Sequence, residues 1–276
     1  MNVSRIKTIT IAMLFMMNVL FGAVILIDTV ADARANRLTV EYACDAVRAG
    51  GIEIDADSII TNTSGAIRTM RTARQDEAEA MIAQAVLGET TMTDHGVIYL
   101  YENAERGTAE FYSAGDFEIR LKNADITNEK GSLRTVLELL SDMGVETSSQ
   151  TVSYSDGIET VTVVDAYKGK SIFNCTTEFV FRDGSLQTIA GRYVTGVEPD
   201  PDGIEITQAA TALLSFLAWV RLGNAECARI DKMEAGYQHR VSGSFGEGVI
   251  VPAWLITADS GRYIIDDETG EILAIA

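Results

Sequence analysis

The first feature of the chain is an apolar run from Ile9 to Ile27 that contains no charged residue. Arg5 and Lys7 precede this run, and Asp28 follows it. At about 1.5 Å per residue, a helix over the run is roughly 28 Å long, close to the ~30 Å hydrocarbon core of a bilayer. The pattern therefore predicts one membrane-spanning helix.

Positive residues stay on the cytoplasmic side of a membrane. We therefore expect a cytoplasmic tail at residues 1–7, a transmembrane helix at 8–28, and an extracytoplasmic remainder held at the cell membrane. A cleaved signal peptide is the alternative, because Ala31-Asp32-Ala33 fits the small-x-small cleavage pattern. The apolar run is longer than the roughly 7–15 residues usual for a signal peptide, which favours the anchor.

Further along, apolar residues recur three and four positions apart, which predicts helices. The first such helix covers 38–49, with a stripe of Val40, Ala43, Cys44 and Val47. A second covers 74–87, where Glu77 and Glu79 lie off an apolar face formed by Ala78, Met81, Ile82, Ala85 and Val86. A third covers 132–143, with a face of Leu133, Val136, Leu137, Leu140 and Met143. The last covers 207–221, with Thr207 as its N-cap.

Alternating apolar and polar residues predict strands after each of the last three helices. The expected strands are 97–101, 108–112 and 117–121, then 150–154, 160–167, 171–181 and 186–194, then 228–233, 249–256, 262–265 and 271–275. Asp156-Gly157 and Asp183-Gly184 are typical of tight hairpin turns. The stretch 196–203, with Pro199 and Pro201, indicates a linker or domain seam.

One helix followed by several antiparallel strands thus recurs along the chain. We predict an α+β fold in which repeated modules of one helix packed on an antiparallel β-meander follow the single transmembrane helix. The expected boundaries are 29–125 for a juxtamembrane helix and the first module, 126–196 for the second module and 197–276 for the third.

Charge and cysteine content narrow the classes of function. A net charge of −18 excludes an electrostatic footprint for nucleic acid and implies repulsion from anionic lipid headgroups. Cys44, Cys175 and Cys227 are too far apart for a zinc motif. We expect them to serve as small buried hydrophobic residues, with one disulfide as the alternative.

Catalytic motifs are missing from the sequence. His95 and His239 have no histidine neighbour and are expected at surface or turn positions. No HExxH, P-loop or G-x-S-x-G pattern occurs. The acids in 200–205 do not complete an EF-hand, and those in 266–268 are expected in a solvated turn. We therefore expect no catalytic, cofactor or metal site and a protein that is not an enzyme.

Two residues of the anchor are candidates for partner binding. Asn18 would lie in the bilayer, where its amide can hydrogen-bond a neighbouring helix, worth about 0.6–2 kcal/mol in model systems. Gly22, four residues further on, lies on the same helix face and allows close approach of another backbone. A passive anchor that tolerates one Asn is the alternative.

Both ends of the chain carry motifs that belong together in one known family. The first end has Lys7-Thr8 in the basic tail and Asn18-Val19 in the apolar run. The second end has a Pro-x-Trp strand, a Tyr-x-x-Asp strand and a Thr-Gly-Glu turn, formed by Pro252, Trp254, Tyr263, Asp266, Thr269, Gly270 and Glu271. These ends resemble YycI and YycH, membrane-anchored regulators of a Gram-positive two-component system, and the second is also similar to PepSY-type modules.

The resemblance implies a non-enzymatic regulator without a cofactor. Its partner would be a sensor histidine kinase linked to cell-wall metabolism, contacted through the membrane helix and the ectodomain. Whether a second single-pass regulator joins the complex stays open. The alternative is a tethered or secreted PepSY-like module that binds proteins or inhibits a protease.

Overall fold

The computed structural model describes residues 17, 34–60, 67–123, 125–241 and 247–275. The predicted transmembrane helix, including Asn18 and Gly22, lies outside these residues except for Met17. Within the described part of the chain, no helix is both long enough and apolar enough to cross a bilayer.

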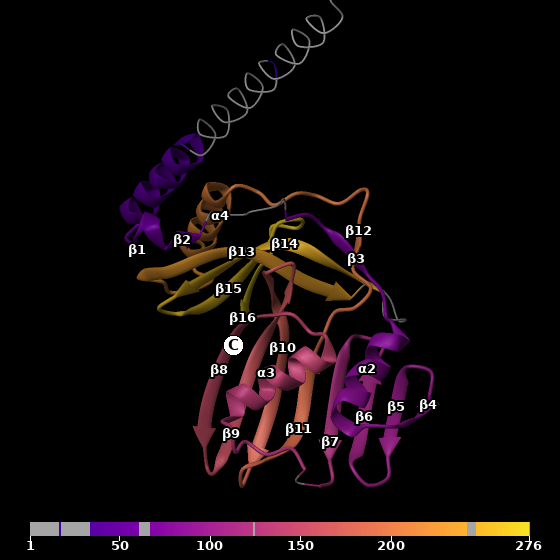
Figure 1. Cartoon of the computed structure of the whole chain (residues 1–276). Coiled ribbons are helices and arrows are strands. Elements are labelled where there is room, and N and C mark those ends of the chain that lie inside the picture. The colour runs from indigo at the N-terminus through magenta and orange to yellow at the C-terminus, as the bar shows by residue number, and fades with distance from the viewer. Residues whose placement is uncertain (1–16, 18–33, 61–66, 124, 242–246, 276) are drawn as a thin grey trace, which may run out of the picture.

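The chain forms a mixed α+β structure with a mostly antiparallel sheet (Figure 1). The helices are residues 34–49, α2 (Asp76–Leu87), α3 (Ser132–Met143) and α4 (Ala209–Arg221), with a 3-10 turn, η1, at Ala56–Ser58. Before α2 come β1 (Glu53–Ile54), β2 (Ile59–Ile60) and β3 (Met70–Thr72).

Strands then follow each later helix, as the sequence pattern predicts, but β4 and β12 were not among the predicted strands. After α2 come β4 (Thr91–Asp94), β5 (Ile98–Asn103), β6 (Gly107–Tyr112) and β7 (Asp116–Leu121). After α3 come β8 (Thr147–Ser155), β9 (Ile158–Tyr167), β10 (Lys170–Arg182), β11 (Ser185–Arg192) and the short β12 (Glu198–Pro199). After α4 come β13 (Arg229–Val241), β14 (Gly248–Ala258), β15 (Gly261–Asp266) and β16 (Ile272–Ile275).

The strands from β4 to β11 form what we call the distal sheet, in the order β8-β9-β10-β11-β7-β6-β5-β4. β7 and β11 pair antiparallel, so the last strand after α2 joins the last long strand after α3. Helices α2 and α3 cover one face of this sheet (Figure 1). The core between them includes Ile82, Val136 and Phe179, and burying each such side chain is worth about 1.5–3 kcal/mol.

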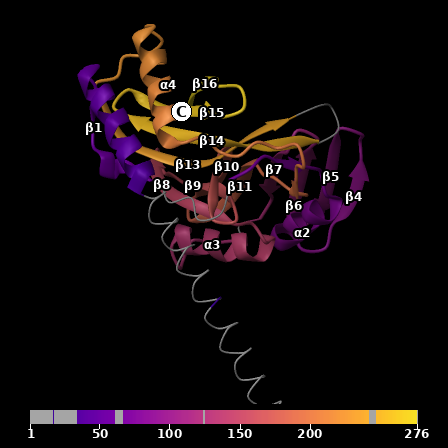
Figure 2. The same ribbon diagram turned by 90° about the horizontal axis from the view of Figure 1, so that it is seen from above.

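The remaining strands form what we call the proximal sheet, built on β13-β14-β15-β16. β1 and β2 add to β13 in parallel, while β3 pairs with β14 and β12 with β3. The helix at 34–49 and α4 pack on the outer face, away from the distal sheet (Figures 1 and 2). Cys44, Leu213, Phe216 and Trp254 lie in the core that they enclose.

β10 belongs to both sheets. It pairs with β9 at both ends and with β11 along its second half, whereas Ile172 pairs in parallel with Tyr237 of β13. Gly236 permits this approach, because a Cβ atom built there would lie 2.5 Å from the Ser171 carbonyl oxygen and 2.5 Å from the Phe173 ring. The two sheets therefore form one continuous path of hydrogen-bonded strands.

Both predicted hairpin turns are confirmed. Asp156 and Gly157 have φ values of 51° and 78°, and Asp183 and Gly184 have values of 50° and 79°. Positive φ at both central residues gives a turn whose twist matches that of the strands. The same geometry occurs unpredicted at Lys168-Gly169, between β9 and β10.

The predicted helix faces are partly wrong. Glu79, expected off the apolar face of α2, is 1% exposed, whereas Met81, expected on that face, is 47% exposed. The buried face consists of Glu79, Ile82, Ala83, Val86 and Leu87, and an ion pair stabilises its one acid. On α3, Leu133 and Leu137 are also exposed by more than a third.

The start of α4 differs from the prediction as well. Gln208 rather than Thr207 holds the N-cap position, and it makes no side-chain cap bond. Thr207 instead donates through its backbone N–H and its hydroxyl to Asp267, at 2.5 and 2.7 Å. The preceding stretch 196–203 contains β12, which pairs with β3. The module boundaries themselves stay predictions.

Candidate functional site

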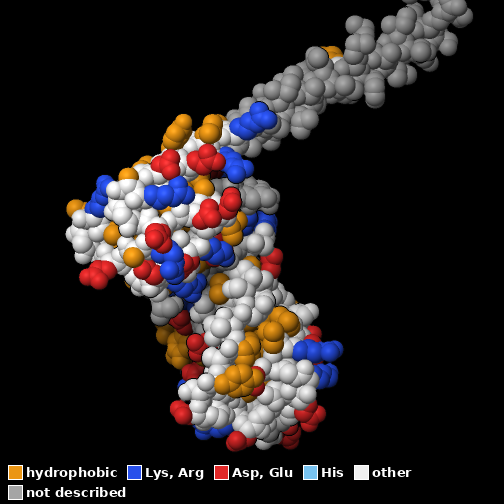
Figure 3. All heavy atoms as spheres, turned by 90° about the vertical axis from the view of Figure 1, so that its left-hand side faces the viewer, with side chains coloured by type: hydrophobic (Ala, Val, Ile, Leu, Met, Phe, Trp, Pro, Cys, Tyr) orange, Lys and Arg blue, Asp and Glu red, His pale blue; other side chains and the backbone are white. Residues whose placement is uncertain are grey.

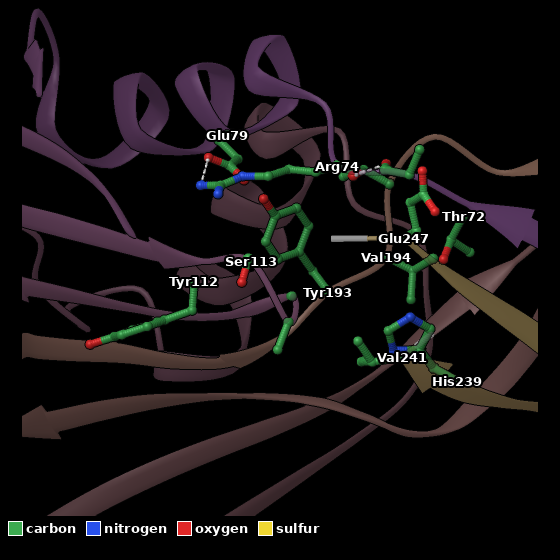
Figure 4. A pocket seen from close by; sticks show the side chains of 14 residues that line it. Thr72, Arg74, Glu79, Tyr112, Ser113, Tyr193, Val194, His239, Val241 and Glu247 are labelled. Atoms are coloured by element: carbon green, nitrogen blue, oxygen red, sulfur yellow. Dashed lines mark hydrogen bonds and ion pairs between the residues drawn. The ribbon is translucent and has the colours of Figure 1, made fainter. Parts of the chain in front are cut away.

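A polar cluster lies where the two sheets meet (Figure 4). Its members come from the segment before α2, from α2, from the turn between β6 and β7, from the end of β11, and from β13. They are Thr72, Arg74, Glu79, Ser113, Tyr193, His239 and Glu247, with backbone and small residues between them. The cavity that they line measures about 30 Å³, room for one or two water molecules. It is too small for an organic substrate.

Arg74 and Glu79 form the centre of this cluster. Arg74 Nε and Nη2 donate to the two carboxylate oxygens of Glu79 at 2.6 and 2.9 Å, and Nη2 also reaches the Phe111 carbonyl at 3.1 Å. The guanidinium lies 3.6 Å from the centroid of the Tyr99 ring. Burial raises the pKa of the Glu79 carboxyl, while the bonds from Arg74 and Tyr193 offset part of that rise. A bidentate pair of this kind positions both side chains firmly.

The tyrosines beside the pair are fully protonated at neutral pH. Burial, helped by the charge of Glu79, raises the pKa of Tyr193, whose hydroxyl points toward the ion pair in Figure 4. Burial also raises the pKa of Tyr101 to about 12. Neither hydroxyl is therefore suited to act as a base.

His239 is the titratable group on the β13 side of the cluster. It is 7% exposed, and its Nδ1 atom has no hydrogen-bond partner. Its backbone N–H and carbonyl bond the Asn174 side chain at 2.8 and 2.7 Å. Burial, with a smaller effect of the Arg192 charge, lowers the pKa of His239 to about 4. The imidazole is neutral at pH 7 and too weak a base for general-base catalysis there.

The prediction of a surface or turn position is therefore wrong for His239 and confirmed for His95, which is exposed. The cluster as a whole resembles a structural tie between the sheets, because its buried charges, Arg74 and Glu79, are paired and its cavity is small.

The C-terminal motif residues lie in the core and in a turn of the proximal sheet. Trp254 is buried, donates through Nε1 to the Thr207 carbonyl at 3.3 Å, and shares a core cluster with Tyr263. β14 pairs with β3 at residues 248–250 and with β15 at residues 253–258, and Pro252 lies between these two segments. A residue without an N–H fits such a gap in the ladder.

The turn between β15 and β16 is solvated at Glu268, as expected, but not at Asp266. Asp266 is 2% exposed, and its Oδ1 atom accepts from the backbone N–H groups of Glu268 and Thr269, both at 2.9 Å. Gly270 donates its N–H to the Asp266 carbonyl, and Glu271 donates its N–H to the Thr269 hydroxyl. These hydrogen bonds hold the motif positions together as a hairpin turn.

Two of the acids in 200–205 form ion pairs with nearby arginines. Asp200 pairs with Arg71 at 3.0 Å and Glu205 with Arg68 at 3.4 Å. Across the described ranges, no three His, Cys, Asp or Glu side chains come together in a way that could hold a metal ion.

The outer edge of β8 is a different kind of site. β8 pairs with β9 on one side, and its nine residues include no charge. All but the first are exposed. Val152 and Tyr154 on this strand are 37% and 75% exposed. Figure 3, which faces this side of the molecule, shows hydrophobic side chains gathered on the distal half.

The start of α3 lies beside this edge. Tyr154 donates its hydroxyl to Glu159 at 2.5 Å, and the same carboxylate accepts from Ser132 at the start of α3. Leu133 and Leu137, 38% and 42% exposed, follow on that helix. We call β8 with these two leucines the open edge.

No protein-family model and no curated protein matches the chain. Two solved structures show a distant likeness. A crystal structure of an uncharacterized protein from Eubacterium rectale ATCC 33656 has a TM-score of 0.49 and 8% identity, over 76% of this chain and 86% of that one. The C-terminal domain of YpeB from Bacillus megaterium has a TM-score of 0.37 and 10% identity, over 74% of this chain and 99% of that one.

Likeness at this level carries no argument about family or function. Nothing in the comparisons supports the link to YycI and YycH.

Proposed function

We propose that the chain is a non-enzymatic, membrane-anchored extracytoplasmic regulator that modulates a sensor histidine kinase of a two-component system by direct protein contact. Cell-wall metabolism is the process that the resemblance attaches to such regulators. The observation that carries the contact part of the proposal is the open edge.

An exposed strand edge presents a row of backbone N–H and C=O groups that can pair with another strand. Proteins usually protect such edges with charges, prolines or short length. β8 is nine residues long and has neither charge nor proline. These properties suit recognition in which an extended segment adds to the sheet by main-chain hydrogen bonds.

The occupant that we propose is an extended segment of the kinase's extracytoplasmic domain. A second copy of this chain is less favourable, because it would bring another charge of −18 to the interface. The exposed side chains of Val152, Tyr154, Leu133 and Leu137 would supply the apolar contact that gives such a strand its register.

The proposal includes the anchor as a second contact. Asn18 and Gly22 would pack beside kinase helices and bias their arrangement. A partner shifts such an equilibrium only when it binds one arrangement better than the other. An Asn18→Leu variant that leaves both expression and kinase output unchanged would remove the anchor from this proposal.

Site-specific photo-crosslinking in the native cell tests the proposal. Photoreactive residues at positions 151 and 153 probe β8, and residues at 14, 18 and 22 probe the anchor. We expect a sensor kinase as the main adduct from both sets, identified by mass spectrometry. Adducts formed only with a second copy, or none from either set, would count against it.

A matched pair of variants adds a second readout. Val152→Lys places a charge on the open edge, whereas Met92→Lys places one on β4, the opposite edge, at a side chain that is 46% exposed. We expect the first variant to lose the β8 crosslink and change kinase output, and the second to do neither. Equal effects of both variants would contradict a role for β8.

The second candidate function is a tethered PepSY-like binding or protease-inhibitory module. It is motivated by the buried C-terminal motif, in which Trp254 and Tyr263 share one core. Exchange of residues 1–28 for an unrelated anchor separates the two functions. If the chain keeps its function with the unrelated anchor, the result favours the tethered module. If the function is lost, the result favours the regulator.

A further inference from the structure

A second cavity lies in the distal half, beneath the ends of α2 and α3. Its volume is about 240 Å³. The apolar part of the lining comes from Ala78, Met81, Ile82, Met143, Val145, Ala166, Ile172 and Val194, with the rings of Tyr167 and Tyr193. The charged residues of this lining are Asp165 and Glu146, and neither is basic.

The switch of β10 between the sheets places Asp165 at this cavity. β9 pairs with β10 at Ala166 opposite Ser171 and at Val164 opposite Thr176. A single residue of β9, Asp165, therefore stands opposite the stretch of β10 that leaves for the proximal sheet. The ladder opens there and α3 ends at Met143, and the cavity borders Asp165 at this place.

Asp165 differs from the other buried acids of the described chain. Glu79 is bonded by Arg74, and Asp266 accepts two backbone N–H groups. Asp165 is 4% exposed, and its Oδ1 atom has no hydrogen-bond partner. Leaving a buried carboxylate oxygen without a hydrogen-bond donor costs free energy. A bound ammonium group would balance the negative charge of the carboxylate and donate a hydrogen bond to this oxygen.

We propose that this cavity binds a small organic cation, with its ammonium group on Asp165 and its apolar body against the methionine, valine and isoleucine side chains of the lining. The size of the cavity suits a primary amine with a compact hydrocarbon group. Glu146, exposed at the edge of the cavity, adds negative potential that draws cations in. This site is independent of the open edge and of the proposed kinase contact.

The protonation state of Asp165 gives the site a further property. Burial raises the pKa of the Asp165 carboxyl well above its ordinary value. A bound ammonium favours the ionised carboxylate, so binding lowers that pKa again and releases a proton at a pH below the pKa of the free site.

Calorimetric titration of the full chain in a non-ionic detergent tests the proposal, with cyclohexylammonium as probe. Cyclohexanol and cyclohexanecarboxylate are the neutral and anionic controls of the same shape. We expect the ammonium to bind at least tenfold more tightly than either control. Equal binding of cyclohexanol, or no ammonium binding at about 10 mM, would overturn the proposal.

Two variants locate the site. Asp165→Asn keeps the shape and removes the charge, and we expect at least a tenfold loss of cyclohexylammonium affinity. Asp142→Asn, at an exposed acid on α3, is the matched control and should bind as the unmodified chain does. Ala78→Leu narrows the cavity and should weaken binding without any change of charge. Unchanged affinity in both Asp165→Asn and Ala78→Leu would contradict this location.

Discussion

His239 makes the stability of the protein depend on pH in a defined window. Its imidazole is buried and neutral in the folded chain, where burial lowers its pKa from 6.5 to about 4. As the pH falls below 6.5, the unfolded chain takes up a proton on this side chain and the folded chain does not. The stability contributed by the neutral imidazole is fully present above pH 6.5 and is lost as the pH falls to about 4.

The size of the effect follows from the same two values. Each pH unit between them is worth about 1.4 kcal/mol, so the loss over the window is about 3 kcal/mol at most. This is a substantial part of the 5–15 kcal/mol typical of a folded domain.

Urea unfolding of the full chain at several pH values measures this loss. In His239→Gln, which has no titrating group at that position, the pH dependence between 6.5 and 4 should be shallower by about 3 kcal/mol. His95→Gln is the control, because His95 is exposed and its removal should leave the dependence unchanged. Equal pH dependence in His239→Gln and the unmodified chain would refute a buried, neutral imidazole.

Other predictions concern packing and thiols. Arg74→Met alone should destabilise the fold by about 3–5 kcal/mol because it leaves the Glu79 carboxylate buried without its partner, and the double variant with Glu79→Gln should recover part of that loss in a double-mutant cycle. Gly236→Ala should cost about 1–3 kcal/mol of unfolding free energy by crowding β10, measured by urea unfolding. All three cysteines are free, two of them buried, so a thiol reagent should modify Cys227 first in the folded chain and all three after unfolding.

Much of the fold was readable from the sequence because local signals agreed with the tertiary structure. The 132–143 helix prediction coincides with α3, whose end is set by Gly144 in a left-handed conformation that glycine adopts readily. Asp-Gly pairs marked two hairpins for the same local reason. The alternation of apolar and polar residues was weakest in very short strands such as β4 and β12. These segments are strands because of the strands that they pair with.

The buried charges could not be assigned from polarity alone. Glu79 continues the spacing of Ile82, Ala83 and Val86 on one helix face, a signal that was present in the sequence. Its partner Arg74 lies before the helix, and only the fold shows that the two meet. Asp165 and His239 sit at alternating strand positions whose burial depends on the β10 crossover, which no local pattern indicates.

The composition of the open edge is visible in the sequence. The stretch 147–155 has no charged residue in a chain that is 22% charged. Its position at the border of the sheet, however, depends on the strand order, which the sequence does not specify. Asn18 and Gly22 lie outside the described residues and stay predictions.

The crossover of β10 also has a mechanical consequence. Hydrogen bonds in a sheet resist sliding when force runs along paired strands, because several must break together. β10 holds partners in both halves, and the Asn174 side chain adds two bonds to the His239 backbone. A twist applied to the helix at 34–49 therefore reaches the far end of the molecule through one covalent strand rather than through a loose joint. The two halves are expected to rotate together as one rigid body.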